Sequence, residues 1–150
     1  MAKENQKPQP ASSTLAARMM TQGWVSIALW MSVGLLLEGL IGYKIPAYLN
    51  DLQRRELFRL AHTHGTLLGL ILVAASLCIR RYIASPMRPA QTALSLGSVV
   101  MPLGFLLAGI WHPEGDPGIA IWLVPPGALM VIFGAIALAL ACFKDASAKD

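Results

Sequence analysis

The stretch that decides the fold is LAHTHGTLLGLILVAASLCI, which runs from Leu60 to Ile79. It contains no Lys, Arg, Asp or Glu, and every residue after His64 is apolar or small. An α-helix rises 1.5 Å per residue, so this stretch would extend for about 30 Å, the thickness of the hydrocarbon core of a bilayer. The stretch is therefore predicted to cross a membrane as one helix.

Three more stretches are apolar and long enough to cross a membrane: about Trp24 to Tyr43, Pro89 to Trp111 and Gly118 to Phe143. The chain of 150 residues is 55% hydrophobic and 13% charged, with a mean hydropathy of +0.57, which is typical of a membrane protein. The predicted fold is all-α, an integral membrane four-helix bundle in antiparallel up-down-up-down order, formed by residues 23–143. The lipid bilayer is its first predicted partner.

The segments outside the four spans are short. Residues 1–22 and 144–150 are polar and are predicted to be tails, the first of them disordered. Lys44 to Arg59 mixes leucines with charged residues, which predicts a short interfacial amphipathic helix between spans one and two. Asp116 and Pro117 are typical of a helix cap and a first helical position, so span four is expected to begin there.

Basic residues indicate the orientation in the membrane. Eight of the twelve lie on the side of the termini: Lys3, Lys7, Arg18, Arg80, Arg81, Arg88, Lys144 and Lys149. The other four are Lys44, Arg54, Arg55 and Arg59. The positive-inside rule predicts that both termini are cytoplasmic, and we expect a cell membrane, specifically a bacterial inner membrane. Because the basic residues are scattered, no nucleic-acid partner is predicted.

Four ionisable residues fall near one face of the predicted bundle: Glu38, His62, His64 and His112. In a four-span chain, the ends of spans one and three and the starts of spans two and four share a side. That side is predicted to be extracytoplasmic. Ionisable side chains in hydrocarbon are costly, so each of these residues is a candidate for function.

Helical spacing indicates which of these side chains can converge. Glu38, His62 and His112 each share a helix face with small residues: Gly34 and Gly42, Gly65 and Gly69, and Gly104 and Ala108, respectively. Small residues allow close approach of membrane helices, so these faces are expected to point inward, with either histidine as the partner of Glu38. His64 lies about 200° around the helix from His62 and is expected to face elsewhere.

Imidazoles together with a carboxylate form a suitable ligand set for zinc, copper or iron, and two imidazoles on different helices can hold a haem. The leading hypothesis is a protein that binds a haem or a transition metal near the extracytoplasmic face. It would act in electron transfer or as an accessory to a membrane redox complex. His62 and His112 are the predicted cofactor-binding residues, and the predicted metal ligands also include Glu38 and His64.

Two other classes of function remain open. In the first, the chain is a non-catalytic structural subunit of a larger membrane assembly or a homo-oligomer, and Glu38 pairs with a partner chain. In the second, it is a small proton-coupled transporter or channel that uses Glu38. The sequence has no H-E-x-x-H, G-x-S-x-G or phosphate-binding loop, so enzymatic activity is left unassigned.

The run RLAHTHGTLLG, from Arg59 to Gly69, resembles uncharacterised bacterial four-helix membrane proteins with a His-Thr-His at the start of the second helix. Over about ten residues it is also similar to the histidine-bearing helices of the haem-copper oxidase catalytic subunit. These resemblances imply membrane-bound haem or metal binding at His62 and His64. A complete oxidase is excluded, because the other metal-binding histidines and eight further helices of that subunit are missing here.

Overall fold

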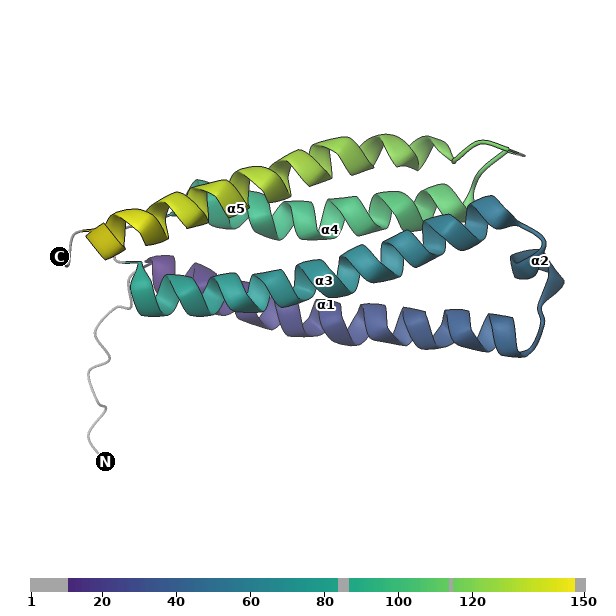
Figure 1. Ribbon diagram of the computed structural model, residues 1–150, viewed down its shortest axis with the longest axis horizontal. Helices are drawn as coiled ribbons and strands as arrows, with labels where there is room; N and C mark the ends of the chain where they lie inside the picture. The colour runs from purple at the N-terminus through teal and green to yellow at the C-terminus, as the bar shows by residue number, and fades with distance from the viewer. Residues whose placement is uncertain (1–10, 84–86, 114, 148–150) are drawn as a thin grey trace, which may run out of the picture.

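The computed structural model describes residues 11–83, 87–113 and 115–147 and contains the four long helices (Figure 1). They are α1 (Ala11–Gly42), α3 (Leu52–Tyr82), α4 (Arg88–Ile110) and α5 (Val124–Ser147). The short helix α2 (Pro46–Leu49) lies between α1 and α3, and a 3-10 helix, η1 (Ile119–Leu123), leads into α5. All four long helices are long and apolar enough to cross a membrane, so this is a multi-pass membrane protein.

The four long helices pack in the order α1, α3, α4, α5, and each is antiparallel to the next. Figure 1 shows this row with α5 at its upper edge and α1 at its lower edge. Within the part of the chain that is described, α1 and α5 do not contact each other. The all-α, antiparallel prediction is confirmed, but the helices form an open row in which both edge helices turn most of their surface outward.

The start of α1 corrects the predicted N-terminal tail. The helix begins at Ala11, so the prediction of a disordered tail is wrong for residues 11–22, and residues 1–10 lie outside the described residues. Ala16 and Met19 are fully buried against α3, and the Ser76 hydroxyl of α3 donates a 2.7 Å hydrogen bond to the Ala16 carbonyl oxygen. This packing makes the segment helical although its composition is polar.

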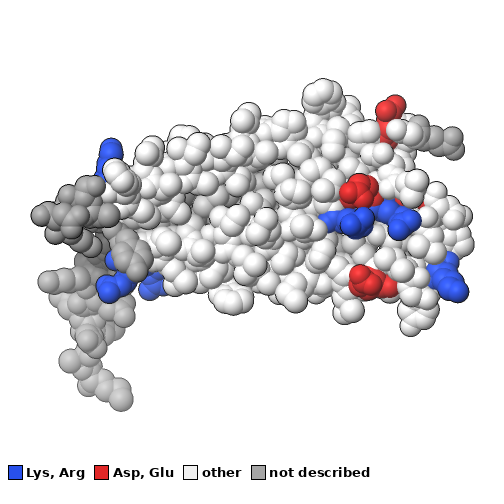
Figure 2. Space-filling model, viewed as in Figure 1, with Lys and Arg blue, Asp and Glu red and all other residues white. Residues whose placement is uncertain are grey.

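The ends of the row differ in charge. At the end that carries α2, here called the α2 end, Figure 2 shows acidic and basic side chains together on the visible face. At the opposite end, here called the terminal end, each long helix carries a basic residue: Arg18, Arg80, Arg88 and Lys144. These charges lie at the ends of four apolar segments, as expected for helices that cross a bilayer.

The short helix predicted between spans one and two is present as α2, and the prediction is confirmed. This helix covers only part of Lys44 to Arg59, because it ends at Leu49 and α3 begins at Leu52 and continues as span two. Lys44 has a positive φ of 52° where the chain leaves α1. The prediction that Asp116 caps span four is wrong: η1 follows Gly118 without a side-chain cap, and α5 starts just before Pro125.

Candidate functional site

His62 lies on the face of α3 that packs against α1. Its Nδ1–H donates a 2.7 Å hydrogen bond to the carbonyl oxygen of Trp30, and its ring packs directly over Gly34. A carbonyl oxygen can only accept, so this contact fixes the proton on Nδ1 and leaves Nε2 as the second functional atom of the ring. The small-residue face of α1 thus holds the imidazole in one orientation, as the spacing of Gly34 predicted.

The ring of His62 borders a groove of about 360 Å³ between α1 and α3, here called the α1–α3 groove. Its lining comprises Met31, Gly34, Leu35, Leu37, Glu38, Ile41, Tyr48, Arg59, His62 and Thr63. Glu38 and His62 therefore both line this groove. The predicted pairing between them is not formed, because Glu38 is exposed and has no hydrogen bond or ion pair among the described residues.

His64 faces a different helix. Its Nδ1–H donates to the Leu60 carbonyl oxygen at 2.8 Å, one turn earlier in α3. Its ring lies 5.1 Å, centroid to centroid, from the Phe105 ring of α4. His62 and His64 therefore contact opposite neighbours in the row, which confirms the separation predicted from their spacing.

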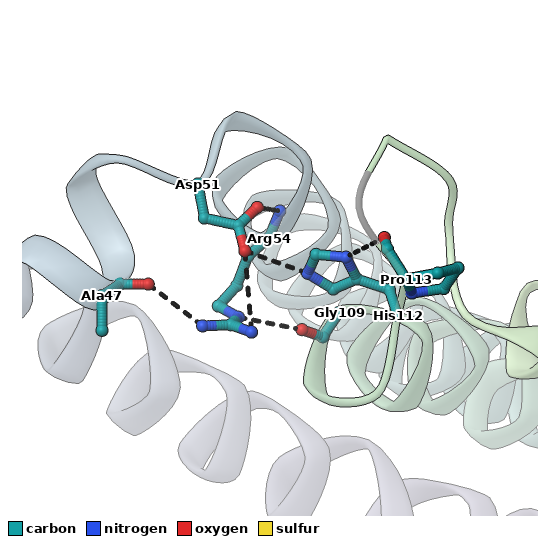
Figure 3. Close-up of polar contacts among 6 residues, drawn as sticks. All are labelled: Ala47, Asp51, Arg54, Gly109, His112 and Pro113. Atoms are coloured by element: carbon teal, nitrogen blue, oxygen red, sulfur yellow. Dashed lines mark hydrogen bonds and ion pairs between the residues drawn. The ribbon is translucent and has the colours of Figure 1, made fainter.

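His112 belongs to a cluster with Asp51 and Arg54 at the α2 end (Figure 3). Its Nδ1–H donates to the Pro113 carbonyl oxygen at 2.9 Å, and its Nε2 lies 3.1 Å from Asp51 Oδ2. The latter contact lacks the alignment of a hydrogen bond and is an ion pair only when the imidazole carries both protons, and the His112 side chain is only 6% exposed. This pair joins the end of α4 to the residue that precedes α3.

Arg54 connects three segments of the same cluster (Figure 3). Its Nε donates to the Gly109 carbonyl oxygen in the last turn of α4 at 3.2 Å, and its Nη1 donates to Ala47 of α2 at 3.0 Å. Its Nη2 lies 3.6 Å from Asp51 Oδ2. A cation at the carbonyl end of a helix is favourable, because the helix dipole is negative there.

Asp51 is the N-cap of α3, and its Oδ1 accepts a 2.9 Å hydrogen bond from the backbone N–H of Arg54. That hydrogen bond is the main cause that lowers the pKa of Asp51, and the nearby charges of His112 and Arg54 add to it. The cluster borders an open pocket of about 710 Å³ that also includes Asn50 and Gln53. The carboxylate is therefore held in its charged form at the rim of this pocket.

The described residues do not assemble the predicted ligand set. His112 is level with Asp51, which precedes His62 by eleven residues, or about 16 Å along α3. Two imidazoles that share one metal ion must each lie about 2 Å from it. Among the residues that the structure describes, no three His, Cys, Asp or Glu side chains are grouped to hold a metal ion. His62 and His112 are therefore too far apart in this arrangement to bind one metal ion together.

Asp51 and Arg54 are the residues that sequence reasoning missed. Asp51 directly precedes an amphipathic run, which is a helix-start pattern and could have been used to find the cap. Its contact with His112 has no such pattern, because it depends on how α2 folds back over the bundle. The sequence has two other acidic residues just after His112: Asp116 is exposed, and Glu114 lies outside the described residues.

Comparison with protein-family models, with curated proteins and with solved structures finds no match for this chain. Its function must therefore be argued from its own geometry. The two resemblances noted for the Arg59 to Gly69 run remain predictions.

Proposed function

We propose that this protein is a non-catalytic accessory subunit of a larger membrane assembly and that the outer face of α1 is its contact surface. Support comes from two glycines at the α2 end of α1. A methyl group added at Gly39 or Gly42 would meet no atom within 4 Å. In a membrane helix, small residues are characteristic of surfaces where another helix approaches closely.

The other helical glycines behave differently. An added methyl group at any of them would contact a neighbouring helix: Gly23, Gly34, Gly65, Gly69, Gly97, Gly104, Gly109, Gly127 and Gly134. Each of these nine glycines therefore lies where two helices of this chain approach closely. Gly39 and Gly42 are the exceptions, and exposed Glu38 lies beside them. A partner helix on this face would pack against the two small residues.

The contacts of His62 and His112 with other segments also favour a structural role. His62 ties α3 to α1 through the Trp30 carbonyl oxygen, and His112 ties the end of α4 to Asp51. Each contact joins two segments that are distant in the sequence. These side chains therefore have a role in stability that needs no cofactor.

Gly39→Leu tests the proposed surface, with Ala139→Leu on the exposed face of α5 as the matched control. Both variants add the same apolar side chain to the outside of the row. The wild-type protein, extracted from its native membrane in mild detergent, is expected to migrate in a complex larger than its 16.1 kDa chain. Gly39→Leu should release the single chain and Ala139→Leu should not. A wild type that migrates alone would refute the proposal.

Haem or metal binding remains a separate prediction, and the same preparation tests it. An ultraviolet-visible spectrum and elemental analysis would detect a Soret band or a bound metal. If either is present and is lost in His62→Ala, the cofactor hypothesis replaces the structural one. If the folded complex carries neither, the accessory role stands.

A further inference from the structure

The α1–α3 groove lies at the boundary of the predicted hydrocarbon layer. Measured from the basic residues of the terminal end, Glu38 is twenty residues from Arg18 in α1, and Arg59 is twenty-one residues from Arg80 in α3. Each spacing corresponds to about 30 Å of helix, the thickness of the hydrocarbon core. Glu38 and Arg59 therefore stand at the same level, where the headgroups of one leaflet meet the acyl chains.

The groove is open to the lipid on one side. Leu35, which lines it, is 76% exposed, and the Arg59 side chain is 67% exposed. Below the two charged residues, the wall is mainly apolar and includes Met31 and Leu35, with His62 and Thr63 as its polar side chains. A molecule that enters from the bilayer would meet opposite charges at its headgroup level and an apolar surface beneath them.

Both charged groups are available to a ligand. Glu38 has no polar partner in the described part of the chain. Arg59 contacts Glu56 at 3.3 Å, but both side chains are well exposed, and ion pairs of this kind contribute little to stability. The guanidinium can therefore turn to another anion at small cost.

We propose that the α1–α3 groove binds a phospholipid whose headgroup carries a primary ammonium, as in phosphatidylethanolamine. The ammonium donates to the Glu38 carboxylate, and the phosphate accepts from Arg59. Charge-assisted hydrogen bonds of this type are roughly twice as strong as neutral ones. A choline headgroup is a cation without an N–H to donate, and a glycerol headgroup donates only neutral O–H groups, so neither offers Glu38 a charge-assisted hydrogen bond.

Tyr48 of α2 closes the groove at its headgroup end. Its side chain is buried and stacks on Phe58, with ring centroids 6.3 Å apart. The Tyr48 hydroxyl is protonated at neutral pH, burial raises its pKa further, and it can donate a hydrogen bond to a phosphate or ester oxygen. On the opposite wall, the His62 ring is held by Trp30. The groove therefore has two fixed walls and an exposed pair of charges.

Native mass spectrometry of the full chain tests the proposal after reconstitution in nanodiscs with equal amounts of phosphatidylethanolamine, phosphatidylcholine and phosphatidylglycerol. The wild type is expected to retain phosphatidylethanolamine about tenfold more often than the other two lipids. Glu38→Gln keeps the shape of the side chain and should remove this preference. Arg59→Gln should lower retention of all phospholipids, because the phosphate contact is common to them.

Glu56→Gln is the matched control, because Glu56 is an exposed carboxylate near Arg59 that does not line the groove. It should keep the wild-type preference. Circular dichroism and thermal unfolding confirm that each variant is folded. Equal retention of the three lipids by the wild type, or an unchanged preference in folded Glu38→Gln, would overturn the proposal. The experiment uses the isolated chain, so its result does not depend on the accessory role of α1.

Discussion

His112 Nε2 lies 3.1 Å from Asp51 Oδ2, and this contact joins the end of α4 to the start of α3. Arg54 lies beside the pair and reaches both α2 and the last turn of α4. The α2 end of the row is therefore held by a cluster of polar groups in addition to the apolar packing of Leu57 and Ala108.

Asp51→Ala is expected to lower the free energy of unfolding by about 1 kcal/mol, because the N-cap of α3 is lost. Asp51→Asn keeps a capping side chain and loses only the charge, so its cost should be smaller. Unfolding in detergent, followed by tryptophan fluorescence, measures both variants. Equal losses in the two variants would show that the cap is not what Asp51 contributes.

Acid should weaken the same cluster. The fold lowers the pKa of Asp51 from its ordinary value of 3.8, so the carboxylate contributes stability that is complete above about pH 4. This contribution is lost as the pH falls through the lowered pKa. The difference in unfolding free energy between wild type and Asp51→Asn should therefore stay constant from about pH 7 to about pH 4 and shrink as the pH falls further. A difference in unfolding free energy that does not shrink in acid would show that the charged Asp51 carboxylate does not stabilise the fold.

Gly34→Ala and Gly39→Ala should have opposite effects. A methyl group at Gly34 would collide with the His62 ring, which its hydrogen bond to Trp30 holds in place, so a loss of about 1–3 kcal/mol is expected. Gly39→Ala meets no atom, and alanine favours a helix over glycine, so the isolated chain should be unchanged or more stable. Thermal unfolding of the two purified variants gives the comparison. Similar losses would mean that α1 does not pack as described.

His62→Ala should cost more stability than His64→Ala. Of the two rings, only His62 forms a hydrogen bond to another helix, whereas His64 bonds to a carbonyl oxygen of its own helix. The expected loss for His62→Ala is about 1–3 kcal/mol, since the interhelical contact and its packing are removed together. Denaturant titration of both variants tests the order. A larger loss in His64→Ala would show that His64, rather than His62, contributes more to stability.

The orientation predicted from the basic residues can be tested with a single cysteine. Ala47 is exposed on α2, and the two native cysteines, Cys78 and Cys142, lie toward the terminal end. In a chain with Cys78→Ala and Cys142→Ala, Ala47→Cys should react with a membrane-impermeant maleimide in intact cells. Labelling only after the cells are opened would place the termini outside.

The number of spans and their alternation follow from the sequence, because bilayer thickness fixes the length of each apolar segment. That His62 and His64 point in different directions follows from helical geometry. The span count and this difference were both predicted. The helix over residues 11–22 was missed because its stability comes from contact of Ala16 and Met19 with α3. Local composition carries no information about such a contact.

The candidate site could be predicted only in part. The close approach of Gly34 and His62 was indicated by their helix faces, and the shared groove of Glu38 and His62 is consistent with it. Convergence of His112 with these residues was expected but is not formed. Its position depends on where α4 ends and on the contact with Asp51, which periodicity within the spans does not describe.

The open row also determines how the chain can assemble during synthesis. Because the main contacts run from α1 to α3, from α3 to α4 and from α4 to α5, each helix finds its main neighbour already in the membrane when it is inserted. Such contacts between successive helices give a low contact order, which favours fast folding. The last helix, α5, needs mainly α4 as its support, so the first three spans can pack before synthesis of the chain is complete.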